Sequence, residues 1–190
     1  MAQVKQDLSI SMAQANAAGL FMGLLPTLPF MLAYGLIWGG DHFFAGFDQF
    51  FGRFWLFLLV FLVGIVIHEA LHGLTWMIAG RKPLSAMKFG VQWKVLTPYA
   101  HSTEPMPAWA YRLGTIMPGL VLGFLPLLIG LIGGSGWVFF VGVVFTLAAG
   151  GDFLILWLIR RVDRQALIED HPTRAGCYVL LDAPAADDPN

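Results

Sequence analysis

Long apolar runs, separated by short polar connections, dominate the pattern of residues along this chain. A window of about 20 residues, the length of helix that crosses a hydrocarbon core of roughly 30 Å, detects four such runs, at residues 17–40, 54–79, 113–133 and 136–159. Each run predicts a transmembrane helix. The connection between the last two is only Gly133–Gly136, so we expect an antiparallel pair there. The pattern predicts an all-α membrane protein in which residues 1–160 form one four-helix domain.

The segments outside these runs have other patterns. Within Lys88–Leu96, polar residues or glycine at positions 88, 90, 92 and 94 alternate with apolar residues. This period of two predicts a short β-strand or hairpin element in the central loop. An amphipathic segment lying on the membrane surface is the alternative. Residues 161–190 are polar, and we expect them to form a tail whose very end is disordered.

The composition excludes several classes of protein. Hydrophobic residues make up 57% of the 190 positions and charged residues 12%, whereas a soluble domain carries roughly 25% charged residues. The chain therefore belongs in a lipid bilayer. Its net charge of −1 leaves no basic excess for a nucleic-acid partner. The single cysteine, Cys177, cannot form an internal disulfide.

The basic residues predict an orientation. Four spans place both termini and the central loop on one side of the membrane. That side holds ten basic residues and the other side holds only Arg53. The positive-inside rule then predicts that both termini are cytoplasmic. We expect a multi-pass protein of a prokaryotic cell membrane.

Histidine and acidic residues are rare inside the predicted spans. Only His68, Glu69, His72 and Asp152 occur there, and an ionisable group at membrane depth costs several kcal/mol unless it is paired, hydrated or metal-bound. His68 to His72 follow the pattern H-E-x-x-H on a helix. Histidines four residues apart share one helix face and can bind one metal ion, and the glutamate can lie beside a water molecule on that ion. These residues indicate zinc-dependent hydrolysis.

A catalytic zinc ion needs a third protein ligand, and Asp152 is the acidic residue that remains in the spans. Asp152 lies eight residues before Arg160, and His72 lies nine before Arg81. At a rise of 1.5 Å per residue, both positions are about 12–14 Å from the same ends of parallel spans. A hydrogen bond from Asp152 to another helix is the alternative.

Other residues of possible chemical importance lie outside the spans. His101, in a proline-rich segment, is a third metal ligand, a substrate-binding group or a solvated loop histidine, and we favour the last interpretation. His171 also competes with Asp152 for the third ligand position, although we expect a structural role for it. His42 fits a solvated residue and Cys177 a packed thiol without catalytic function.

Three segments together resemble a known family. The sequence His68–Gly73, the Gly150-Gly151-Asp152 element, and Asp170-His171-Pro172 followed by Gly176 are similar to the zincin peptidase family of small membrane proteins. That family in turn resembles the site-2 intramembrane zinc metalloproteases. The resemblance implies that His68, His72 and Asp152 bind Zn²⁺ and that Glu69 is the general base. One departure from the site-2 enzymes is that Gly-Gly precedes Asp152 and Phe153 follows it. We also expect no PDZ-like domain that would select substrates.

These observations predict an intramembrane zinc metalloprotease. Its substrate would be a membrane protein or a membrane-associated peptide, hydrolysed by a zinc-activated water molecule with Glu69 as the base. An extended substrate could pair with the strand at Lys88–Leu96. A metal transporter, or a metal-binding membrane adaptor, would use the same ligands without hydrolysis.

Overall fold

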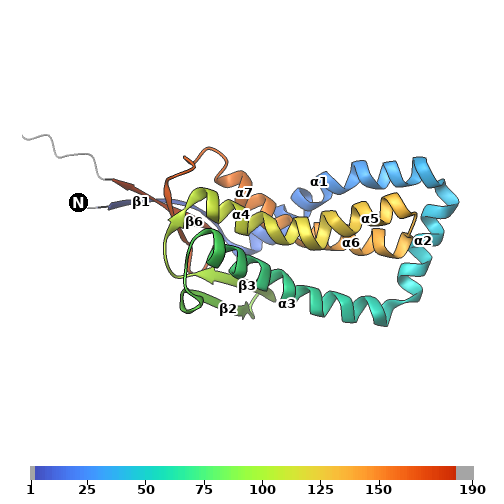
Figure 1. The fold of residues 1–190 in the computed structure, drawn as a ribbon, viewed down its shortest axis with the longest axis horizontal. Helices are drawn as coiled ribbons and strands as arrows, with labels where there is room; N and C mark the ends of the chain where they lie inside the picture. Colours follow the sequence, from blue (N-terminus) through green and yellow to red (C-terminus); the bar gives the residue numbers. More distant parts are fainter. Residues whose placement is uncertain (1–2, 183–190) are drawn as a thin grey trace, which may run out of the picture.

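Helices form most of the molecule, which is described for residues 3–182 of a computed structural model (Figure 1). Two long helices, α1 and α3, are joined by α2 at the end of the molecule far from the strands. The segments α4, η2 (a π-helix) and α5 form one continuous helical segment, and α6 and α7 form a second one that is bent. The bounds are α1 Met12–Trp38, α2 Gly40–Gly52, α3 Phe54–Ala79, α4 Ala108–Pro118, η2 Gly119–Phe124, α5 Leu125–Gly133, α6 Gly136–Ala148 and α7 Gly150–Leu158.

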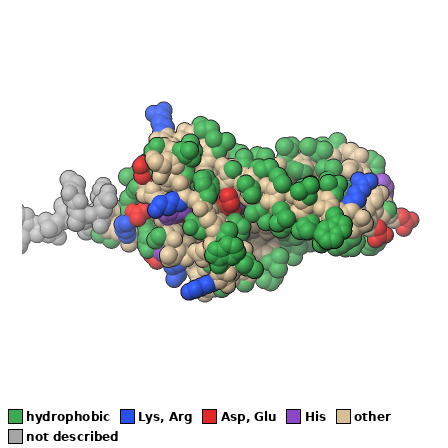
Figure 2. Space-filling view, turned by 90° about the horizontal axis from the view of Figure 1, so that it is seen from below, with side chains coloured by type: hydrophobic (Ala, Val, Ile, Leu, Met, Phe, Trp, Pro, Cys, Tyr) green, Lys and Arg blue, Asp and Glu red, His purple; other side chains and the backbone are tan. Residues whose placement is uncertain are grey.

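The helices are suited to a bilayer. Three of them, Met12–Trp38, Phe54–Ala79 and Ala108–Gly133, are long and apolar enough to cross a membrane, and the bent pair α6–α7 makes a fourth if it counts as one span. Many large apolar side chains on α1 and α3 are exposed, Phe21 by 73% and Ile78 by 71%. Figure 2 shows charged side chains gathered at the two ends of the molecule, with a largely hydrophobic surface between them.

The expectation of an all-α protein needs correction, because the structure contains two antiparallel sheets. The larger has the strand order β1-β6-β5-β4. The bounds of its strands are β1 Gln3–Ile10, β4 Met106–Pro107, β5 Leu167–Asp170 and β6 Ala175–Asp182. β1 pairs with β6 along its whole length, from Gln3 opposite Asp182 to Ile10 opposite Ala175.

The segment predicted as a polar tail therefore contains two strands. Ile168, Cys177 and Val179 from these strands are buried. Ile168 and Cys177 join Trp76 and Tyr111 in a cluster that attaches the sheet to the ends of the helices. No local pattern predicts the pairing of β1 with β6, because the two strands lie near opposite ends of the chain. The disorder predicted for the very end of the tail concerns residues 183–190, which lie outside the described residues.

The central loop forms the smaller sheet. β2 (Met87–Gln92) pairs with β3 (Thr97–Ser102), with Phe89 opposite Ala100. A four-residue turn, 93–96, replaces the second half of the strand expected over Lys88–Leu96, and Leu96 adopts a positive φ of 50° there. A short 3-10 helix, η1 (Leu84–Ala86), leads from α3 into this hairpin.

The last predicted span is not one straight helix. α6 and α7 meet at Ala149 with a bend of 42°. The bend accompanies a close approach of α7 to α1, where a Cβ atom at Gly150 would lie only 1.8 Å from the carbonyl oxygen of Gly19. Only glycine permits such contact between two backbones. Asp152 consequently lies in the first turn of α7, facing α3.

Candidate metal centre

The H-E-x-x-H segment lies in the second half of α3, as the sequence predicts. His68 and His72 are one helical turn apart, and the centroids of their rings are 4.9 Å apart. Both side chains are largely buried, with exposed fractions of 13% and 7%. They face the interior of the bundle, whereas Ile67 and Leu74 on the same helix are exposed toward the lipid region.

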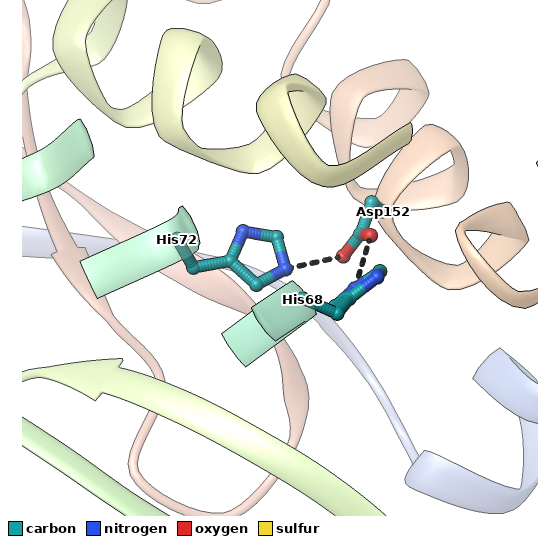
Figure 3. Close-up of side chains that lie close together, drawn as sticks. All are labelled: His68, His72 and Asp152. Carbon is teal, nitrogen blue, oxygen red and sulfur yellow. Dashed lines mark ion pairs between the residues drawn. The ribbon is translucent and has the colours of Figure 1, made fainter. Parts of the chain in front are cut away.

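Asp152 reaches both histidines from α7 (Figure 3). Its Oδ2 lies 3.1 Å from Nε2 of His68, and its Oδ1 lies 3.3 Å from Nε2 of His72. One ligand atom from each residue falls within 4.8 Å of the other two. Two helices that are far apart in the sequence thus bring together the three residues predicted as metal ligands.

The spacing of these atoms fits a shared metal ion. Zinc–nitrogen and zinc–oxygen bonds of 2.0–2.1 Å in a tetrahedron separate neighbouring ligand atoms by about 3.3 Å. Each Nε2 lies close to this distance from a carboxylate oxygen of Asp152, His68 at 3.1 Å from Oδ2 and His72 at 3.3 Å from Oδ1. Among the described residues, Oδ2 of Asp152 is buried without a properly oriented hydrogen-bond donor. A buried carboxylate oxygen is costly in that state, and a bound cation would satisfy it.

A second set of contacts orients His72. Its Nδ1–H donates a hydrogen bond of 2.9 Å to the carbonyl oxygen of Gly114 in α4, which leaves Nε2 as the metal-binding atom. The ring also stacks on Trp76, with centroids 5.4 Å apart and planes at 18°. A Cβ atom at Gly114 would lie 2.1 Å from the Trp76 ring, so glycine at this position allows the stack. Metal-binding histidines commonly have such a backbone acceptor for the other nitrogen.

Glu69 lies beside the cluster and does not belong to it. It lines a cavity of about 510 Å³ together with His68, His72 and Asp152. Its carboxylate faces the backbone of Ala100 in β3. The position is suited to a group that exchanges a proton with a water molecule in the cavity.

The cavity extends from the cluster to the sheets, and its far part holds a polar network that sequence reasoning missed. Nδ1 of His101 lies 3.0 Å from Oδ2 of Asp170 at the end of β5. The hydroxyl of Tyr111 donates to Oδ1 of the same carboxylate at 2.8 Å, and the Ser102 N–H donates to Oδ2 at 3.3 Å. His101 is therefore not a solvated loop histidine, and it has a carboxylate partner. No local pattern connects His101 with Asp170, which follows it by 69 residues.

The other candidates have structural surroundings. Nδ1 of His171 accepts hydrogen bonds from the N–H groups of Thr173 and Arg174, and Nε2–H donates to the Tyr178 hydroxyl at 2.9 Å. Burial lowers the pKa of His171 from its ordinary value. The described contacts therefore match the structural role expected for this histidine.

Two further residues do not contribute to the cluster. His42 is exposed, as expected, and it hydrogen bonds to the carbonyl oxygen of Gly134 and stacks on Trp38 near α2. Cys177 is fully buried, and burial raises the pKa of its thiol to about 12.

The class of protein follows from these observations: a mostly helical protein with three to four helices long and apolar enough to cross a membrane, and a buried group of two histidines and an aspartate that could hold a metal ion. The model of a family described as "Putative zincin peptidase" matches residues 61–167, more than half of the chain. The chain belongs to this family. The match includes His68, Glu69, His72 and Asp152. No curated protein and no solved structure matches the chain.

Proposed function

We propose that the protein is an intramembrane zinc metalloprotease of the site-2 type, which hydrolyses peptide bonds of membrane proteins or membrane-associated peptides. The observation that carries the proposal is the joining of His68, His72 and Asp152 into one buried group, beside Glu69 and in a shared cavity. Membership of the zincin peptidase family supports the same chemistry.

Each residue has a role that its position supports. His68, His72 and Asp152 hold the zinc ion through two Nε2 atoms and a carboxylate oxygen. When bound, zinc polarises the peptide carbonyl and makes a water molecule more acidic. Glu69 accepts the proton of the attacking water molecule and then gives it to the leaving amine nitrogen. The carbonyl carbon gains the water oxygen as the carbon–nitrogen bond breaks, so no other reactant is needed.

Water would reach the site from the cytoplasmic side. The cavity extends past the zinc ligands to Gln92, Asp170 and Arg174, which belong to the sheets and their turns. The basic residues also concentrate at this end: Lys5, Arg81, Lys82, Lys88, Lys94, Arg112, Arg160, Arg161, Arg164 and Arg174. By the positive-inside rule, this concentration of basic residues supports a cytoplasmic location for this end and for both termini.

The substrate would bind as an extended strand, along β3 rather than along the strand at Lys88–Leu96 named from the sequence. β2 occupies one edge of β3, and the opposite edge faces Glu69 and Asp170. Residues 97–101 of β3 line the cavity. The N–H groups of Ala100 and Ser102 on this edge already face Glu69 and Asp170, so a peptide would lie unwound in the cavity beside β3 and would bind through side chains and carbonyl oxygens.

A cleavage assay tests the proposal. The purified protein in detergent is expected to cleave a transmembrane peptide, and a zinc chelator is expected to abolish the reaction. Glu69→Gln should keep zinc and lose cleavage, because the amide cannot accept the proton. Glu104→Gln is the matched control, since Glu104 lies on the surface near Lys82 and away from the cavity.

Other outcomes would overturn the protease function. Zinc bound by the wild-type protein with no cleavage, together with zinc uptake into vesicles, would favour a transporter. Zinc binding with neither activity would favour an adaptor.

A further inference from the structure

His101 is placed like a reactive group rather than a structural one. Its side chain is 16% exposed and lines the cavity. A carboxylate can only accept, so the 3.0 Å contact with Asp170 means that Nδ1–H of His101 donates. Among the described residues, Nε2 has no hydrogen-bond partner. His171 differs, because both of its ring nitrogens are engaged by its own turn and by Tyr178.

The outer edge of β3 brings His101 near Glu69. The backbone of Ala100 faces Glu69, and the N–H of Ser102, two residues further along the same strand, donates to Asp170. Two residues of a strand span about 7 Å. The two carboxylates therefore lie at neighbouring positions on one strand edge, and His101 lies between these positions in the sequence.

The partner of His101 is held rigidly relative to the zinc ligands. Asp170 accepts a hydrogen bond from the Tyr111 hydroxyl at 2.8 Å. The Tyr111 ring stacks on Trp76 at 5.5 Å, and Trp76 stacks on His72 at 5.4 Å. This series of packed rings connects His72 with the carboxylate that orients His101.

Hydrolysis of a peptide bond needs a group at such a place. As water attacks, the electron pair of the C=O double bond moves to the carbonyl oxygen, and a preorganised donor stabilises the charge that develops. When both of its ring nitrogens carry a proton, a histidine whose Nδ1–H is bound to a carboxylate presents its second N–H as an oriented donor. Two other basic residues share these surroundings: Lys88 is opposite His101 in the hairpin, and Arg174 lines the same cavity.

We propose that His101, oriented by Asp170, donates a hydrogen bond from Nε2 to the carbonyl oxygen of the peptide bond that is cleaved. The proposal rests on the metalloprotease function above. The donor returns to its starting state when the carbon–nitrogen bond breaks, because the proton for the amine comes from Glu69. His101 is thus a catalytic residue and Asp170 a positioning residue.

The test compares His101→Ala, His101→Gln and Asp170→Asn with the wild type, using a detergent-solubilised transmembrane peptide. Each variant is assayed for kcat, KM and zinc per chain. Removal of one such donor is expected to lower kcat about 100-fold, with KM and zinc content unchanged. His101→Gln should recover part of kcat, because its amide can donate. Asp170→Asn should lower kcat less than His101→Ala, since it keeps the imidazole.

His42→Gln serves as the matched control, because His42 hydrogen bonds to the carbonyl oxygen of Gly134 near α2 and does not line the cavity, and its kcat should equal that of the wild type. A kcat of His101→Ala within twofold of the wild type would overturn the proposal. Loss of zinc or a raised KM that accounts for the whole effect would overturn it as well. An inactive wild type, or a Glu69→Gln variant that cleaves normally, would instead refute the metalloprotease function itself.

Discussion

Gly150→Ala is expected to weaken metal binding without touching any ligand. A Cβ atom at this position would lie 1.8 Å from the Gly19 carbonyl oxygen, 2.6 Å from its carbonyl carbon and 2.9 Å from the Gly23 nitrogen. All three atoms belong to the backbone of α1, so no side-chain rotation relieves the contact. Ordinary van der Waals contact begins near 3.4 Å, and α7 must therefore move away from α1 by about 1.5 Å.

This displacement is large compared with the tolerance of a metal site. Asp152 lies two residues after Gly150 in α7, whereas His68 and His72 lie in α3 and stay in place. Metal–ligand distances are held within about 0.2 Å, and disturbed support around a site lowers metal affinity by roughly 10–100-fold. We expect Gly150→Ala to fall in this range and to cost about 1–3 kcal/mol of stability from overpacking.

Gly151→Ala is the matched control. A Cβ atom there meets nothing within 4 Å, and the gain in helix propensity is the same for both variants. Zinc affinity is measured by competition with a chelator, together with the helical content by circular dichroism. If Gly150→Ala bound zinc as tightly as Gly151→Ala, the close approach of α1 and α7 would not position Asp152.

Three further predictions concern the ligands, the sheet and the topology. Asp152→Ala should sharply reduce zinc per chain at near-normal helical content, because two histidines are an incomplete set of ligands. The variants His101→Ala and His171→Ala should retain zinc. Full zinc occupancy in Asp152→Ala would exclude Asp152 as a ligand. The pKa of His171 lies below its ordinary value of 6.5 in the folded protein. The unfolded chain therefore binds more protons, and the stability of the fold should fall as the pH drops below about 6.5. Thermal unfolding should show this pH dependence, and His171→Gln should lack it. Cysteines introduced at Ala45 and Arg164 should be labelled by a water-soluble maleimide from opposite sides of the membrane. The native Cys177 should not interfere in intact cells, because its thiol is buried and its pKa is raised to about 12. Labelling of both introduced cysteines from one side would refute the predicted orientation.

The metal cluster was predictable because its signals are local or few. His68 and His72 share a helix face through their spacing alone, and Asp152 is the acidic residue that remains in the apolar runs. Their meeting in the structure follows from the matched depths of two parallel helices. Helix α3 also has the bounds predicted for the second apolar run.

The sheet and the His101 network depend on long-range pairing and were not predictable in this way. β1 and β6 are eight-residue strands near the two ends of the chain, and no turn joins them, because the turn before β6 connects it to β5 instead. Asp170 acquires its role only when β5 brings it to His101, Ser102 and Tyr111. The bend at Ala149 accompanies the contact between Gly19 and Gly150, which the pattern of one helix cannot show.

X-ray absorption spectroscopy of the zinc-loaded protein at the zinc edge identifies the atoms that bind the metal ion. We expect two imidazole nitrogens and a carboxylate oxygen at about 2.0–2.1 Å, with water completing the set of four ligands. In Asp152→Ala the protein oxygen ligand should be lost, and in Glu69→Gln the wild-type spectrum should remain. A sulfur ligand at about 2.3 Å, or a first shell with fewer than two imidazoles, would contradict the account.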